Sequence, residues 1–176
     1  MRRSFHLLGI LILLGMLSAC GWQLRGNYDL PDELRRVQLS AADPLHPIVR
    51  RVERALTIAG VEISETASLT LRLERLEREQ RNVALDRRAR PSEKGIWLSL
   101  PMSVVADNGA ALVGPLELQA NRIYRFDPNN VVAMNEEEKL IENELQDTLV
   151  GQLMRRLQRI KPSALDRADI DRADSD

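Results

Sequence analysis

The chain has 176 residues, of which 25 are Lys or Arg and 26 are Asp or Glu, so its net charge is close to zero. This balance lacks the basic excess of a nucleic-acid-binding domain, and we expect no nucleic-acid partner. The length suits one domain, and the single cysteine, Cys20, excludes an internal disulfide.

The first 19 residues have the pattern of an export signal. Arg2 and Arg3 precede an apolar run over residues 7–17, which is shorter than the roughly 20 residues that a membrane-spanning helix needs but suits a signal-peptide core. The tetrapeptide Leu17-Ser18-Ala19-Cys20 matches a bacterial lipobox. We therefore predict that residues 1–19 are removed and that Cys20 is lipidated, carrying a diacylglycerol and an N-linked acyl chain. An ordinary secretory signal with an incidental cysteine is the alternative.

The lipid predicts where the protein resides. Anchoring by more than one acyl chain holds a protein stably at a membrane. In the bacterial lipoproteins that this N-terminus resembles, an Asp after the cysteine retains the product at the inner membrane. Gly21 stands in that position here, so we expect an outer-membrane location.

The next segments predict a lead, a strand and a helix. Residues 20–33 contain Gly, Asn, Asp and Pro and are expected to form a lipid-anchored lead. Alternating apolar residues predict a short strand over 34–39. A helix is expected to begin at Asp43-Pro44 and to end at Gly60, with an apolar stripe of Ile48, Val52, Leu56 and Ala59.

Residues 68–80 give two conflicting signals. Leucines alternate with polar residues at 69, 71 and 73, which is strand periodicity, whereas Glu74/Arg78 and Glu77/Arg81 are spaced as helical ion pairs. The alternation favours a strand. A hairpin is expected next, with Asn108-Gly109 as its turn and with inward residues Leu98, Leu100, Met102, Val104, Leu116, Leu118 and Ala120. Pro101 predicts an edge position or a bulge.

A second helix is expected to begin at Asn135, with Glu138 as its capping-box partner, and to end at Pro162. Residues 162–176 are charged, with little to bury, and are predicted to be disordered. The predicted domain, residues 34–161, is α+β: a two-layer sandwich in which two helices pack on an about four-stranded, mostly antiparallel sheet, in the order β-α-β-β-β-α.

The residues show no catalytic or metal-binding constellation. His46, the one histidine after the signal, is expected to be a surface or capping residue, and adjacent Glu136, Glu137 and Glu138 are expected to compensate the helix dipole. We therefore expect no enzyme activity, no metal and no cofactor beyond the lipid on Cys20.

One charged segment is a candidate binding site. Five basic residues, Arg81, Arg87, Arg88, Arg90 and Lys94, face only two acidic ones between positions 81 and 94, and Pro91, Ser92 and Gly95 indicate a turn. Arginines gathered at a turn can bind phosphate groups through charge-assisted hydrogen bonds. A solvated loop that merely keeps a sheet end soluble is the alternative.

Several motifs together resemble one family. The opening Cys20-Gly21-Trp22-Gln23-Leu24-Arg25-Gly26 resembles that of LptE, the lipopolysaccharide-assembly lipoproteins, and so do the hairpin, the stretch from Tyr124 to Asn129 and the Glu-rich last helix. The resemblance covers roughly residues 20–160. It implies an α/β lipoprotein that plugs the lumen of the outer-membrane β-barrel LptD, on the periplasmic side, assists its assembly and binds lipopolysaccharide.

The resemblance also implies lipopolysaccharide contacts. Basic residues near a strand-connecting loop bind lipopolysaccharide phosphates in the family, and Arg88 and Arg90 match by region, with Arg87 and Lys94 beside them. A second basic site near the start of the last helix is replaced here by Val132 to Asn135, with only Lys139 nearby. The alternative function is a stand-alone, periplasm-facing lipoprotein that carries an apolar ligand between helices and sheet.

Overall fold

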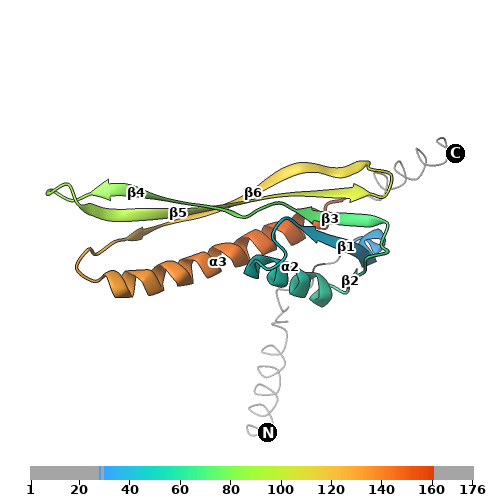
Figure 1. Cartoon of the computed structure of the whole chain (residues 1–176), viewed down its shortest axis with the longest axis horizontal. Coiled ribbons are helices and arrows are strands. Elements are labelled where there is room, and N and C mark those ends of the chain that lie inside the picture. The colour runs from blue at the N-terminus through green and yellow to red at the C-terminus, as the bar shows by residue number, and fades with distance from the viewer. Residues whose placement is uncertain (1–27, 29, 161–176) are drawn as a thin grey trace, which may run out of the picture.

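The computed structural model describes Tyr28 and residues 30–160 (Figure 1). The predicted signal peptide, the lipidation site Cys20 and the tail at 162–176 lie outside the described residues. Within the described range, no helix is long and apolar enough to cross a membrane.

The described chain forms two layers, with both α-helices on the same side of a curled mixed sheet (Figure 1). This confirms the predicted α+β class, although the sheet has six strands rather than four. In chain order the elements are η1 (Asp32–Arg35), β1 (Arg36–Ala41), α2 (Pro47–Ile58), β2 (Glu62–Ile63), β3 (Leu69–Leu73), β4 (Glu77–Leu85), β5 (Pro91–Ala106), β6 (Ala111–Arg125) and α3 (Val131–Leu157).

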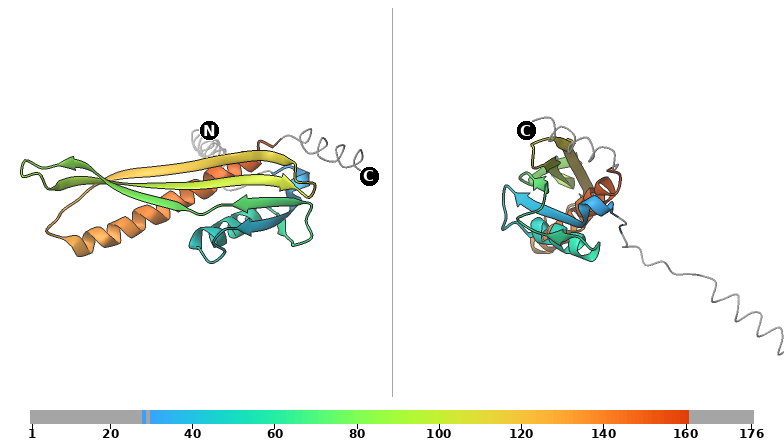
Figure 2. Two further views of the ribbon diagram at one scale, coloured as in Figure 1. Left: turned by 45° about the horizontal axis from the view of Figure 1, so that its top comes forward. Right: turned by 90° about the vertical axis from the view of Figure 1, so that its right-hand side faces the viewer.

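Strand β5 is the centre of the sheet. It runs antiparallel to β6 on one side, while on the other side β3 pairs with residues 102–106 and β4 with residues 91–99. Strand β1 lies parallel to β3 and to β2. As a result β4, β5 and β6 form a twisted ribbon that extends away from the other strands (Figure 2).

The strand predicted over 68–80 is therefore two strands, interrupted at residues 74–76. Pro101 lies opposite the interruption: its carbonyl accepts a hydrogen bond from Glu74 N (2.9 Å), and its ring nitrogen has no proton to donate on the same side. Of the two positions predicted for Pro101, the edge is wrong, since β5 is central. The alternative, a bulge, has support close by, because the register of β5 against β6 shifts between Met102 and Val104. The helical ion pairs do not form either, because Arg78 pairs with Glu142 and Arg81 with Glu79.

The core lies between β5 and α3. Alternate residues of β5, from Ile96 to Val104, are buried against the apolar stripe of α3, as the periodicities predicted. Fully buried side chains on the two sides include Leu100, Met102, Leu149 and Leu153. Burial of such side chains contributes about 1.5–3 kcal/mol each, so this layer accounts for much of the stability of the fold.

Both helix starts differ from the prediction. Helix α2 begins at Pro47, not at Asp43-Pro44, because His46 caps it: His46 Nδ1 accepts a hydrogen bond from Ile48 N (3.2 Å). The capping role expected of His46 is thereby confirmed. At the other end Gly60 has φ +83°, the left-handed conformation that a C-terminal glycine favours.

Helix α3 begins at Val131, four residues earlier than predicted, and Asn130 is its N-cap, with the side-chain oxygen accepting from Ala133 N (3.4 Å). The glutamates at 136–138 consequently lie beyond the first turn, so their predicted capping and dipole roles are wrong. The helix ends at Leu157, and Ile160 beyond it is buried.

Gln146 of α3 yields a stability prediction. Its side chain is buried, and its Oε1 has no hydrogen-bond partner among the described residues. Because an unpaired buried polar group costs about 1–3 kcal/mol, we expect Gln146→Met to raise the free energy of unfolding by about 1 kcal/mol and the Tm by about 2–4 °C. Calorimetry measures both.

Gln152→Met is the matched control. Gln152 is also on α3, but its amide donates to the carbonyl of Gln119 on β6 (2.9 Å), so its loss should lower stability. If Gln146→Met lowers the Tm as much as Gln152→Met does, the amide of Gln146 is not an unfavourable group.

Candidate functional site

The turn between β4 and β5, residues 86–90, is built around one carboxylate. Asp86 Oδ1 accepts the backbone N–H groups of Arg88 (2.7 Å) and Arg90 (3.0 Å), and its Oδ2 accepts Arg90 Nε (2.9 Å). These contacts lower the pKa of Asp86, and the hydrogen bond from Arg90 N is the largest cause. They also close a turn in which Ala89 takes a positive φ of 59°. The turn therefore has a defined shape.

This turn, called the basic tip below, presents its arginines to solvent. Arg87, Arg88 and Arg90 are all exposed. Arg90 is paired with Asp86, whereas the side chains of Arg87 and Arg88 have no hydrogen bond or ion pair within the described chain. The tip lies at one end of the molecule (Figure 1), and exposed Val83 and Leu85 precede it on β4. It thus combines unpaired positive charge with apolar surface.

Lys94 lies apart from the three arginines. It belongs to β5 rather than to a turn, since Pro91 to Gly95 continue the strand and the expected turn there is wrong. Its ammonium faces inward, 3.6 Å from the centroid of the Phe126 ring and 3.9 Å from Glu138 Oε1. The geometry therefore groups Arg87, Arg88 and Arg90 but places Lys94 in a different environment.

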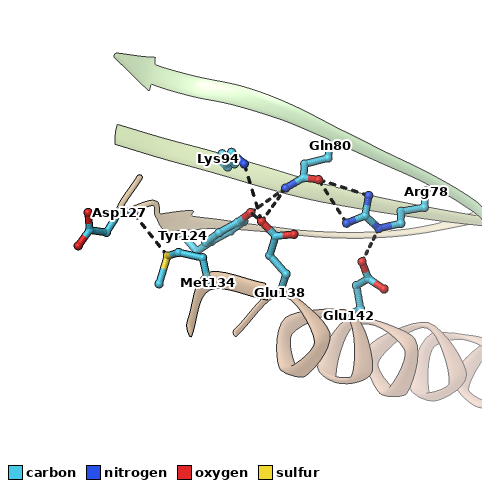
Figure 3. A network of polar contacts seen from close by, with 8 residues as sticks. All are labelled: Arg78, Gln80, Lys94, Tyr124, Asp127, Met134, Glu138 and Glu142. Atoms are coloured by element: carbon cyan, nitrogen blue, oxygen red, sulfur yellow. Dashed lines mark hydrogen bonds and ion pairs between the residues drawn. The ribbon is translucent and has the colours of Figure 1, made fainter. Parts of the chain in front are cut away.

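Behind the tip, a polar network joins α3 to the ribbon (Figure 3). Glu138 Oε1 accepts from the hydroxyl of Tyr124 on β6 and from Gln80 Nε2 on β4 (2.9 Å), and Gln80 also donates to the Tyr124 oxygen (2.8 Å). Arg78 extends the network by pairing with Glu142. Burial, and then the bond to Glu138, raises the pKa of Tyr124 above its usual value.

Sequence reasoning missed this network, because Gln80, Tyr124 and Glu138 lie in three segments that each had a simpler local explanation. Glu138 in particular matched a capping pattern. Within the described residues no group of three or more His, Cys, Asp or Glu side chains is placed to hold a metal ion. The network connects α3 to the two strands, β4 and β6, that it contacts in the ribbon.

Comparison with solved structures first places the fold. An uncharacterized lipoprotein B from Nitrosomonas europaea, solved by NMR, matches with a TM-score of 0.68 and 22% identity, covering 84% of this chain and 96% of that one. The rare lipoprotein B from Shewanella oneidensis matches with a TM-score of 0.59 and 20% identity, covering 77% of this chain and 97% of that one. At these identities the likeness shows a shared fold.

The family follows from sequence. Residues 34–157 match the profile of the LptE family, described as lipopolysaccharide-assembly. The "LPS-assembly lipoprotein LptE" of Photorhabdus laumondii is 27% identical over 154 residues, which cover 86% of this chain and 82% of the relative. That of Yersinia pestis is 26% identical and covers 86% and 73%. The chain belongs to the LptE family of lipopolysaccharide-assembly lipoproteins, as the sequence motifs suggested.

The network behind the tip predicts a pH-dependent effect of Tyr124→Phe. Near neutral pH the substitution leaves Glu138 and Gln80 without the hydroxyl, and we expect a loss of about 1–3 kcal/mol in the free energy of unfolding. The pKa of Tyr124 is raised in the folded protein. The contribution of its hydroxyl to the free energy of unfolding is therefore complete below about pH 10, the ordinary tyrosine pKa, and decreases as the pH rises above that value.

Denaturant unfolding of both proteins at pH 8 and pH 11 measures the difference. We expect the gap between wild type and Tyr124→Phe to shrink at pH 11. A gap that stays constant or widens would show that the Tyr124 hydroxyl is not held protonated by this network.

Proposed function

We propose that this chain is the lipoprotein subunit of the outer-membrane lipopolysaccharide translocon. Anchored through lipids on Cys20 at the periplasmic side of the outer membrane, it lies in the lumen of the β-barrel LptD, assists the assembly of that barrel, and binds lipopolysaccharide during delivery to the cell surface. Membership of the LptE family carries this proposal. The proposal includes no catalytic step and no cofactor.

The basic tip supports lipopolysaccharide binding. Exposed guanidinium groups suit phosphate groups, which they bind with paired hydrogen bonds, and exposed Val83 and Leu85 offer apolar surface beside them. Lys139, the first basic residue of α3, is already paired with Glu136 (2.7 Å). We therefore assign phosphate binding to Arg87 and Arg88, with Arg90 as a part of the turn that also faces solvent. Lys94 is assigned to packing against Phe126 and Glu138.

The position of the tether fits this assignment. Tyr28, the first described residue, lies beside Gly151 in the C-terminal half of α3, eight residues after Cys20. Gly151 is 20 residues from Val131, or about 30 Å along the helix, and the tip lies beyond that start of α3 (Figure 1). The binding end thus lies at the opposite end of α3 from Tyr28.

The alternative of an apolar-ligand carrier receives less support. The space between the helices and the sheet holds fully buried side chains, among them Leu71, Leu100 and Leu149. These side chains fill the location that the alternative assigned to its ligand.

A partner test comes first. We expect the tagged, lipidated chain, isolated from its native outer membrane in mild detergent, to bring down a large β-barrel protein in stoichiometric amount, as mass spectrometry would show. Isolation of the lipoprotein without any barrel, at every detergent strength, would refute the plug function and favour the apolar-ligand carrier.

A charge reversal tests the tip. Because phosphate binding needs free cations, we expect Arg87→Glu combined with Arg88→Glu to weaken lipopolysaccharide binding at least tenfold, and wild-type binding to weaken with salt. The assay is titration of the purified chain with lipopolysaccharide. Arg90 is left unchanged because its side chain and N–H shape the turn.

Arg50→Glu combined with Arg54→Glu is the matched control. These two arginines are exposed on α2, away from the tip, and the substitution changes the net charge equally. We expect it to bind normally. Equal weakening by both double variants would indicate a general charge effect and contradict the assignment to the tip.

A further inference from the structure

The face of the sheet opposite the helices carries a groove. Both helices cover one face (Figure 1), and the opposite face is open between β4 and β6, with β5 as its floor. The groove encloses about 350 Å³. Its lining includes one aromatic ring and several hydrogen-bonding side chains, namely Arg81, Trp97, Ser99, Glu117, Gln119 and Asn121.

Trp97 forms a flat platform in this outer-face groove. Its ring lies across Gly95, where a Cβ atom would come within 2.4 Å of a ring carbon, so only glycine allows this position. The guanidinium carbon of Arg81 lies 5.1 Å from the ring centroid. The indole is half-buried. The missing side chain of Gly95 therefore leaves room for the indole ring directly over that residue.

Both arginines that line the groove are already paired. Arg81 pairs with Glu79, and Arg78, which also lines the groove, pairs with Glu142. Glu117 accepts a hydrogen bond from the Ser99 hydroxyl, which is the main cause of its lowered pKa, with Gln119 second. The amides of Gln119 and Asn121 are exposed beside these groups. The groove thus offers fixed donors and acceptors without a free cation.

Such a surface selects among ligand chemistries. A phosphate would find no unpaired cation, and an acyl chain would leave the amides and carboxylates without partners, which is costly. A sugar ring has an apolar C–H face and a rim of hydroxyl groups. It can place that face on an aromatic ring while its hydroxyls pair with amides and carboxylates.

We propose that the outer-face groove binds the saccharide part of a glycolipid, with Trp97 as the platform and Gln119, Asn121 and Glu117 as hydrogen-bonding partners. This inference rests on the proposed function and deepens it. Trp97 is seven residues after Arg90, which directly precedes β5, or roughly 23 Å along an extended chain. One lipopolysaccharide molecule can therefore place its phosphates at the basic tip and its sugars in the groove.

The test compares two probes on the full lipidated chain in detergent: lipopolysaccharide with its core oligosaccharide, and lipid A prepared from it, which lacks those sugars. We expect the wild type to bind the complete molecule more tightly. Trp97→Ala should weaken that binding about tenfold, as for a central aromatic contact, and lipid A binding less than twofold. Trp97→Phe should retain most of the affinity.

Control variants separate loss of contact from loss of fold. Ser103→Ala changes another outward residue of β5 that does not line the groove, and it should bind both probes normally. Asn121→Ala removes one amide from an exposed position and should repeat the selective loss even if Trp97→Ala unfolds.

The possible results distinguish failure of the saccharide site from failure of the proposed function. Equal affinity of the wild type for the two probes would overturn the saccharide site while leaving lipopolysaccharide binding intact. No binding of either probe would refute the proposed function as well. Unchanged lipopolysaccharide binding by Trp97→Ala and Asn121→Ala, with lost co-purification of the barrel, would overturn the saccharide site and mark the groove as a protein contact.

Discussion

The structure depends on the packing of alternate residues of β5 against the apolar stripe of α3. Five side chains of β5, from Ile96 to Val104, and the α3 residues opposite them are almost completely buried. Every other strand is placed by its relation to β5, directly or through β3. Because β5 has 16 residues and α3 has 27, the two elements form a long rod. Strand β6 runs along most of β5, β4 pairs with its first half, and β1, β2, β3 and α2 lie around the other half (Figure 1).

The half of the rod where β4 pairs with β5 carries the candidate site, and polar contacts take over there from apolar packing. Lys94, Tyr124 and Gln80 occupy inward positions that would hold core residues elsewhere in the sheet, and Glu138 of α3 satisfies all three. Buried polar groups are stable only when paired, so this network fixes how the ribbon sits on α3. The basic tip and the outer-face groove are both carried by that ribbon, which relates their positions to each other.

The sequence predicted what repeats regularly along a single segment. The stripe of α3, the alternation of β5 and the Asn108-Gly109 turn were all found where expected. It misassigned two features that depend on a distant segment: the division of residues 68–80 into two strands follows from Pro101, and the role of Glu138 follows from Tyr124. The start of α3 was misplaced for a local reason, because Asn130 caps the helix instead of Asn135. Short capping and ion-pair patterns occur at several positions of the sequence, so they could not by themselves identify the residues that form these contacts in the folded chain.

The sequence by itself determined the family of the protein, because the match over residues 34–157 compares residues along the chain and needs no coordinates. The cluster of arginines is likewise visible in contiguous residues. Only the tertiary structure decided which arginines are free. Arg90 is bound by Asp86 and Lys94 by Glu138, leaving Arg87 and Arg88 unpaired among the described residues. The groove likewise exists only where β4, β5 and β6 lie side by side. Charge and side-chain type can be read from the sequence directly, whereas the pairing and exposure of a side chain depend on which neighbours folding brings into contact with it.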